Sequence, residues 1–249
     1  MVKISNRLMT AASLVSEGMI LADVGTDHGY VPIYLMEQKR IPSAIAMDIN
    51  EGPLERAREH ITLYGMDTYI KTRLSDGVAA MKPGEADAIL IAGMGGGLVM
   101  HILKDGEAVC HAAKELILQP QSELERVRAF LEEEGYEILA EDMVFEEDKF
   151  YPMMKVRYTG EALDKLREKK QDLPKMQDVD PYKLFNLYGG LLLKNQHPVL
   201  KTFLEKENML YTDIEKNLQN QAASEKISVR LKEVQELLRY NRAARKCFE

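Results

Sequence analysis

The residues best suited to chemistry are aspartates that stand where short apolar runs end. Asp23 and Asp27 belong to the segment DVGTDHGY, in which Gly25 and Gly29 permit a tight turn and a close approach of backbone to ligand. Like charges about 4 Å apart repel by ~4 kcal/mol at an effective dielectric near 20, so these carboxylates disfavour a diphosphate. A cationic ligand without phosphate, such as S-adenosylmethionine, would be attracted instead. The alternative is that Asp27 only caps the following helix.

Two further acidic residues follow the next apolar runs. Asp48, with Ile49 beside it, can accept hydrogen bonds from both hydroxyls of a ribose. Nicotinamide proteins and S-adenosylmethionine proteins share this device, so Asp48 does not separate them. Asp76 can accept from an adenine amino group, and Gly77 leaves room for the ring. Because ligands bind at the carboxyl ends of parallel strands, the series predicts a nucleoside pocket.

A parallel sheet is needed to bring these residues together. Apolar runs typical of buried strands alternate with helical patterns. The strands are expected at 19–24, 43–48, 69–75, 86–93 and 115–120, and the helices at 4–15, 30–38, 51–64, 97–104 and 123–134. The alternation predicts an α/β, Rossmann-like sheet with right-handed crossovers. Residues 136–158 hold two β-rich stretches, which predict an antiparallel pair, so the last strand should be antiparallel.

The chain changes character near residue 160. Residues 161–181 are polar and predict a linker or an exposed helix, and the helical spacing of 181–196 is interrupted by Gly189-Gly190. Beyond them, apolar side chains recur every three or four residues on two segments separated by a polar break at 222–224. This spacing predicts two antiparallel helices in a small helical domain. The expected domains are therefore 1–159, which binds the cofactor, and 160–249.

The composition argues against several classes of protein. The chain has 249 residues, of which 45% are hydrophobic and 29% charged, as in ordinary globular proteins. Two cysteines argue against a disulfide framework or a cysteine zinc site, and no metal is expected. No apolar run reaches the ~18 residues of a membrane span, and the start lacks a secretory signal. We therefore expect a cytoplasmic protein that does not enter membranes.

Charge is distributed unevenly. The net charge is −7, but residues 160–249 hold 17 basic and 14 acidic side chains, which leaves 16 and 26 for residues 1–159. A basic C-terminal part that follows an acidic N-terminal part indicates two separate functions. The tail is either a solvated helix face or a site for a polyanion. Its candidates for phosphate contacts are Arg239, Arg242, Arg245 and Lys246.

The fourth predicted strand ends in the glycine-rich segment 91–97. Many adenine-modifying methyltransferases carry an acidic residue or asparagine, two prolines and an aromatic residue here, whereas this chain has glycines and a methionine. Gly93 to Gly97 could let the backbone approach a flipped base, with Gly93 and Met94 closest to it. The alternative is a flexible loop before a helix.

The segments DVGTDHGY, AMDIN, SDG, IAGMGG and LILQPQ, in this order and before a helical region, resemble the bacterial TrmK family of tRNA (adenine-22, N1)-methyltransferases. The resemblance covers essentially the whole chain. It implies a class I methyltransferase domain, S-adenosylmethionine as methyl donor and an adenine in the tRNA D-loop as acceptor. It also implies a coiled-coil-like C-terminal domain that helps to hold tRNA.

Individual roles follow as hypotheses. Asp27 is the first candidate to stabilise the cationic product ring, unless it serves only the cofactor. His28 either contacts the base or a phosphate, or packs, and Tyr30 either lines the pocket or is structural. Arg7 binds the cofactor carboxylate or an RNA phosphate, or is an ordinary surface cation.

Two other classes of function remain open. A nicotinamide-dependent oxidoreductase could use the same sheet, although Asp27 argues against the phosphate cradle that it needs. A non-catalytic module could bind RNA or protein through its C-terminal helices. The retained acids at 23, 27, 48 and 76 argue against a degenerate pocket. We expect tRNA as partner and no obligate protein partner.

Overall fold

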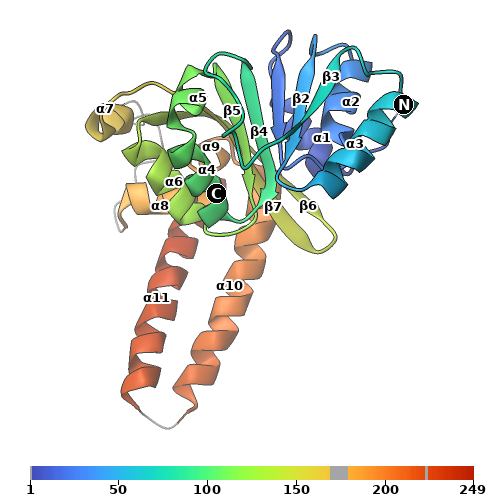
Figure 1. The fold of residues 1–249 in the computed structure, drawn as a ribbon. Coiled ribbons are helices and arrows are strands. Elements are labelled where there is room, and N and C mark those ends of the chain that lie inside the picture. Colours follow the sequence, from blue (N-terminus) through green and yellow to red (C-terminus); the bar gives the residue numbers. More distant parts are fainter. Residues whose placement is uncertain (1, 169–178, 222–223) are drawn as a thin grey trace. The chain divides into compact units, whose positions relative to one another are not determined.

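The computed structural model describes residues 2–168, 179–221 and 224–249, and the chain forms two compact units, Met1–Lys169 and Lys170–Glu249. The first unit contains a seven-stranded sheet in the order β3-β2-β1-β4-β5-β7-β6 (Figure 1). Its strands are β1 Leu21–Val24, β2 Ala44–Asp48, β3 Ile70–Leu74, β4 Ala88–Met94, β5 Glu115–Pro120, β6 Tyr136–Glu146 and β7 Lys149–Tyr158.

The sheet is mostly parallel. Neighbouring strands from β3 to β5 pair in parallel, and β7 pairs antiparallel with both β5 and β6. The predicted α/β fold with an antiparallel last strand is confirmed. The chain runs outward from β1 to β3 and returns to β4 beside β1, so the carboxyl ends of β1 and β4 flank the switch point where such sheets bind ligands.

Helices cover both faces of this sheet (Figure 1). One apolar core lies under α1 Asn6–Ser13, α2 Tyr30–Glu37 and α3 Glu51–Leu63. The other lies under α4 Gly96–Asp105, α5 Glu107–Ala112 and α6 Leu124–Glu133. The helix α5 is not predicted from the sequence, because its six residues are too few for a clear helical pattern. The last helix of this unit is α7 Leu163–Glu168, in the polar stretch after β7.

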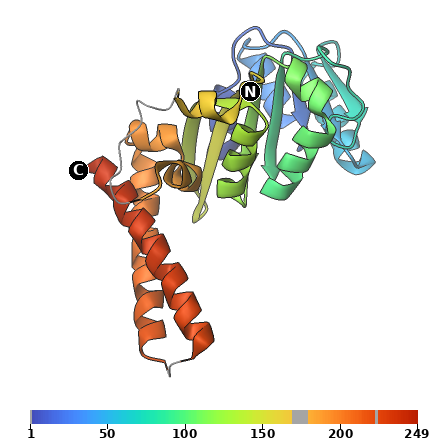
Figure 2. The same cartoon turned by 90° about the vertical axis from the view of Figure 1, so that its left-hand side faces the viewer.

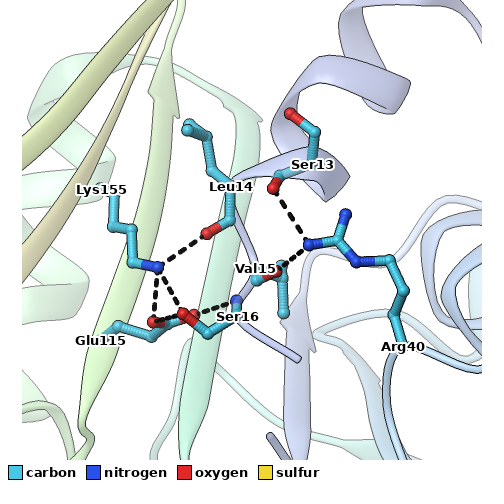
Figure 3. A network of polar contacts seen from close by, with 7 residues as sticks. All are labelled: Ser13, Leu14, Val15, Ser16, Arg40, Glu115 and Lys155. Carbon is cyan, nitrogen blue, oxygen red and sulfur yellow. Dashed lines mark hydrogen bonds and ion pairs between the residues drawn. The ribbon is translucent and has the colours of Figure 1, made fainter. Parts of the chain in front are cut away.

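A buried ion pair fixes the segment that follows α1 (Figure 3). The Lys155 ammonium on β7 lies 2.7 Å from the Glu115 carboxylate at the start of β5, and it also donates to Leu14 O and Ser16 Oγ. Glu115 accepts from both the amide and the hydroxyl of Ser16. From the other side, Arg40 donates to Val15 O at 2.6 Å. The network therefore ties the end of α1 to the sheet.

Replacing Lys155 by methionine should lower the free energy of unfolding by about 1–3 kcal/mol, because the buried Glu115 carboxylate loses its counter-charge. Glu115 keeps its two bonds from Ser16, which limits the loss. Urea titration followed by circular dichroism measures the change. The same substitution at exposed Lys149 on the same strand is the control, and equal stability of the two variants would contradict the assigned role.

The second unit is helical. It contains α8 Pro181–Tyr188, α9 Gly190–Lys194, α10 Pro198–Gln219, α11 Glu225–Arg245 and the 3-10 turn η1 Lys246–Phe248. The two long helices lie side by side and run antiparallel, as predicted (Figures 1 and 2). Residues 169–178 of the predicted linker and 222–223 of the predicted break lie outside the described residues. None of the described helices is long and apolar enough to cross a membrane.

A buried polar cluster joins α8, α10 and α11. The Glu207 carboxylate accepts from the Tyr188 hydroxyl at 2.7 Å and from Asn241 Nδ2 at 2.9 Å, and the same Nδ2 donates to Leu204 O. Nearby apolar side chains are buried, whereas those toward the turn between α10 and α11 are half-buried or exposed. Burial raises the pKa of Tyr188 well above its usual value, so its hydroxyl stays a donor.

Candidate functional site

The acidic turn, residues 23–30 at the end of β1, begins with a buried carboxylate. Asp23 is only 5% exposed, and its Oδ2 accepts a 2.6 Å hydrogen bond from the Thr26 hydroxyl. Burial raises the pKa of Asp23 to about 6; the Thr26 hydrogen bond opposes this rise, and the charges of Asp27 and Asp48 add to it. The three predicted acids therefore act on one another at one end of the sheet.

The backbone of this turn explains its glycines. Gly25 and Gly29 have φ of +72° and +69°, in the left-handed region that favours glycine, and His28 has φ of +57°. The helix α2 begins after Gly29 without any side-chain cap. The Asp27 side chain is 74% exposed, and its contact is with His28 Nε2 at 3.4 Å. Asp27 therefore does not cap α2.

Three aromatic rings gather beside the turn. The rings of His28, Tyr30 and His60 have pairwise centroid distances of 5.1 Å and nearly parallel planes. His60 lies on α3, and its Nδ1 is 3.2 Å from the carbonyl oxygen of His28. This contact holds the strained His28 backbone. His60 is not predicted as a site residue, because one histidine on a polar helix belongs to no motif.

The end of β2 presents Asp48 and Ile49 to solvent. Asp48 is half-buried; its Oδ1 accepts from the Asn50 amide at 2.8 Å, and the described residues give Oδ2 no partner. Ile49 is 58% exposed, so an apolar surface lies next to this carboxylate in the chain. An acceptor beside an exposed apolar surface is suited to a ribose and its base.

A small pocket opens beside the end of β3. Asp76, which is exposed, and the half-buried Gly77 line it together with His101, Ile102 and Asp105 of α4. A Cβ on Gly77, whose φ is +51°, would lie 3.0 Å from Ile102. The left-handed turn favours glycine here, and a side chain would also crowd Ile102 on α4.

The end of β4 meets the acidic turn. A Cβ on Gly25 would lie 2.3 Å from Met94 Cε, so the two segments are in contact. Beyond Met94, the glycines do not have the predicted role of letting the backbone approach a flipped base. The Gly96 amide donates to Ser122 Oγ at 3.1 Å and the Gly97 amide to Glu123 at 2.9 Å. These two amides are occupied by the loop after β5, and Met94 is the residue of this segment that contacts the acidic turn.

Arg7 reaches the same place from α1. Its Nη1 donates to Gln119 Oε1 at 2.8 Å and lies 3.6 Å from the position of a Cβ on Gly93. The guanidinium carbon is 5.5 Å from the centre of the Tyr151 ring, an arrangement that favours a cation. Arg7 is therefore no ordinary surface cation, and the structure brings it together with Gly93.

The other predicted cations belong to the second unit. Arg239, Arg242 and Arg245 are exposed on α11, and Lys246 is exposed on η1. Steps of three and four residues place them on one side of the helix. Within the described residues, none of the three arginines forms an ion pair, and Arg239 lies over the Tyr240 ring at 5.5 Å.

The raised pKa of Asp23 predicts a pH-dependent cost of folding. In the unfolded chain Asp23 ionises near pH 3.8, but in the folded protein only near pH 6, so folding is penalised increasingly from pH 4 to 6 and fully above. Asp23→Asn keeps an acceptor for Thr26 and should raise the melting temperature at pH 7 but not at pH 4. Thermal melts at both pH values measure this, with Asp213→Asn on α10 as control. A rise at pH 4 equal to that at pH 7 would contradict the assignment.

Comparison with known proteins defines the class. A family model described as "Methyltransferase domain" matches residues 4–154, the part that contains the sheet and the acidic turn. The first unit is therefore a methyltransferase domain.

Individual relatives show which family of methyltransferases the chain belongs to. The Bacillus subtilis tRNA (adenine(22)-N(1))-methyltransferase is 38% identical over 152 residues, which are 61% of this chain and 64% of that relative, so the match spans slightly less than two thirds of it. The structure of B. subtilis M1A22 tRNA methyltransferase TrmK has a TM-score of 0.83 and 29% identity over 98% of this chain and 100% of that one. Streptococcus pneumoniae Sp1610 in complex with S-adenosyl-L-methionine has 0.76 and 31% over 99% and 100%. The chain belongs to the TrmK family.

Proposed function

We propose that this protein transfers a methyl group from S-adenosylmethionine to N1 of adenine 22 in the D-loop of tRNA. The observation that carries the proposal is likeness over the whole chain to a TrmK structure, combined with a group of interacting carboxylates at the switch point of the sheet. The S-adenosylmethionine complex of Sp1610 supports the same donor for this chain.

The acidic residues at this end of the sheet suit a cationic nucleoside. Within the described residues, no lysine or arginine forms an ion pair with Asp23, Asp27 or Asp48, so their negative charge is uncompensated. A diphosphate would add to this charge, which disfavours the nicotinamide alternative. We assign Asp48 and Ile49 to the ribose and base, Asp76 and Gly77 to the adenine, and Asp23, Gly25, Asp27, Gly29 and Tyr30 to the remainder of the donor.

The reaction needs little proton chemistry. When bound, S-adenosylmethionine supplies an electrophilic methyl group on a positively charged sulfur. The N1 atom of adenine carries a free lone pair at neutral pH, so no residue has to remove a proton, and the task of the site is alignment. The product ring is cationic, and the exposed Asp27 carboxylate stabilises that charge. His28, Gly93 and Met94 frame the position of the base.

The second unit supplies contacts to the RNA backbone. Since N1 lies inside a base pair or stack, the adenine must be extruded before reaction, and the enzyme must hold the surrounding strand meanwhile. The unpaired guanidinium groups of Arg239, Arg242 and Arg245, with Lys246, are suited to phosphates. We therefore assign tRNA binding to residues 160–249 and cofactor binding to residues 1–159.

Incubation with unmodified tRNA and labelled S-adenosylmethionine tests the function. We expect label in tRNA, and mapping should find 1-methyladenosine at position 22 and none in a transcript carrying guanine there. Tight binding of NADH without methyl transfer would instead favour the oxidoreductase. RNA binding without affinity for S-adenosylmethionine would favour the non-catalytic module.

A further inference from the structure

A β-bulge interrupts β4 beside the proposed site. In the pairing with β5, Ala92 lies opposite Gln119 and Met94 opposite Pro120, so Gly93 is one residue too many. Its φ of +84° is left-handed. The extra residue of a bulge has no ladder partner, and its amide must be satisfied otherwise. Here Gly93 N donates to the side-chain Oε1 of Gln119 at 3.2 Å.

The same oxygen of Gln119 also holds Arg7. It accepts from Arg7 Nη1 at 2.8 Å, so one carbonyl oxygen links α1 to the bulge. Gln119 is completely buried, and Arg7 is further held by the Tyr151 ring. The start of α1 is fixed as well, because the Glu146 carboxylate accepts from the backbone amides of Asn6 and Arg7.

The neutral side-chain amide of Gln119 costs free energy of folding at this position. Gln119 Nε2 is buried and has no hydrogen-bond partner, which costs free energy in any protein. A glutamate could accept the same two hydrogen bonds and form an ion pair with Arg7. Within the described residues, Arg7 forms no ion pair, and the contacts of Glu146 go to backbone amides. The amide thus fixes the guanidinium while leaving its charge uncompensated.

We propose that Gln119 is a positioning residue, which holds Arg7 beside the Gly93 bulge so that the guanidinium binds an anionic oxygen of a ligand. The proposal rests on the proposed function. Two sources of that oxygen share the required chemistry: the carboxylate of the methyl donor and a phosphate next to the target adenosine. An arginine held in place recognises either one through charge-assisted hydrogen bonds.

The variants Gln119→Glu and Gln119→Met separate positioning from packing. Glutamate keeps both accepted hydrogen bonds but neutralises Arg7, whereas methionine fills the space and accepts neither. With Gln119→Glu we expect a melting temperature close to that of the wild type and a roughly tenfold loss of affinity for the anionic ligand. Gln38→Glu, exposed at the far end of α2, adds the same charge and serves as control.

Two measurements identify whether the anionic oxygen belongs to the methyl donor or to the tRNA. If the ligand is the donor carboxylate, calorimetry shows weaker S-adenosylmethionine binding and unchanged binding of 5′-methylthioadenosine, which lacks the carboxylate. If it is a phosphate, the KM for tRNA rises and the slope of log affinity against log salt falls by about 0.9. Wild-type values for Gln119→Glu in both measurements would overturn the proposal, even if Gln119→Met failed to fold. An inactive wild-type protein would instead refute the proposed function.

Discussion

Asp48→Ala should raise the dissociation constant for S-adenosylmethionine by a factor of about 10 to 100, equivalent to roughly 1–3 kcal/mol. The described residues leave Asp48 Oδ2 without a partner, so the ligand would be its main one. Two ribose hydroxyls donating to one ionised carboxylate are stronger than neutral hydrogen bonds, and alanine removes both. Isothermal calorimetry with the purified protein measures the change.

Asp48→Asn and Asp213→Ala complete this test. Asparagine keeps one acceptor but loses the charge, so its affinity should lie between those of the wild type and Asp48→Ala. Asp213 is exposed on α10 in the second unit, and its replacement should leave binding unchanged. At saturating donor the methylation rate of Asp48→Ala should equal that of the wild type, because the proposed contact is with the ribose and not with the reacting atoms. Wild-type affinity in Asp48→Ala would remove this residue from the site.

Replacing Arg239, Arg242 and Arg245 together by glutamine should weaken tRNA binding about 100-fold or more at physiological salt, because three phosphate contacts and their released counterions are lost. The affinity should also depend less on salt, with the slope of log affinity against log salt falling by roughly 2–3. Filter binding or fluorescence anisotropy over a range of salt concentrations measures both. Affinity for S-adenosylmethionine should stay at the wild-type value.

A second triple variant controls for net charge. Lys194, Lys201 and Lys216 are exposed on α9 and α10, and their replacement by glutamine changes the charge by the same amount. We expect a much smaller loss of tRNA affinity from it. Equal losses in the two triple variants would show that general charge, and not the α11 face, attracts the RNA.

The order of the elements was predictable because local pattern determines it. The apolar runs before Gly25 and at 115–120 have the length and composition of buried strands, and the structure contains β1 and β5 there. The turn residues Gly25 and Gly29 were also identifiable, since their left-handed backbone favours glycine. Asp23 and Asp48 could be placed at the same end of the sheet, because the carboxyl ends of neighbouring parallel strands lie together.

Residues whose roles depend on distant neighbours could not be found in this way. Gln119 follows an apolar strand, and nothing local shows that its oxygen serves Gly93 and Arg7 from elsewhere in the chain. Gly96 looked like a residue for ligand approach, but a Cβ there would lie 2.4 Å from Ser122 O. Such a contact between two loops becomes visible only when the strands are arranged in space.

The buried cluster of Tyr188, Glu207 and Asn241 has a consequence for how the helical hairpin can evolve. Because buried polar partners on neighbouring helices fix a single register, a slip of α11 by one turn would break both hydrogen bonds of Asn241 Nδ2, and a slip of α10 would also break that of Tyr188. Toward the turn, the described residues hold no comparable buried cluster, and the apolar side chains are half-buried or exposed. The two helices are joined there by an exposed hydrogen bond from Gln235 Nε2 to Glu215 Oε1. Insertions or deletions of whole helical turns at that end would therefore alter the reach of the hairpin without disturbing its alignment.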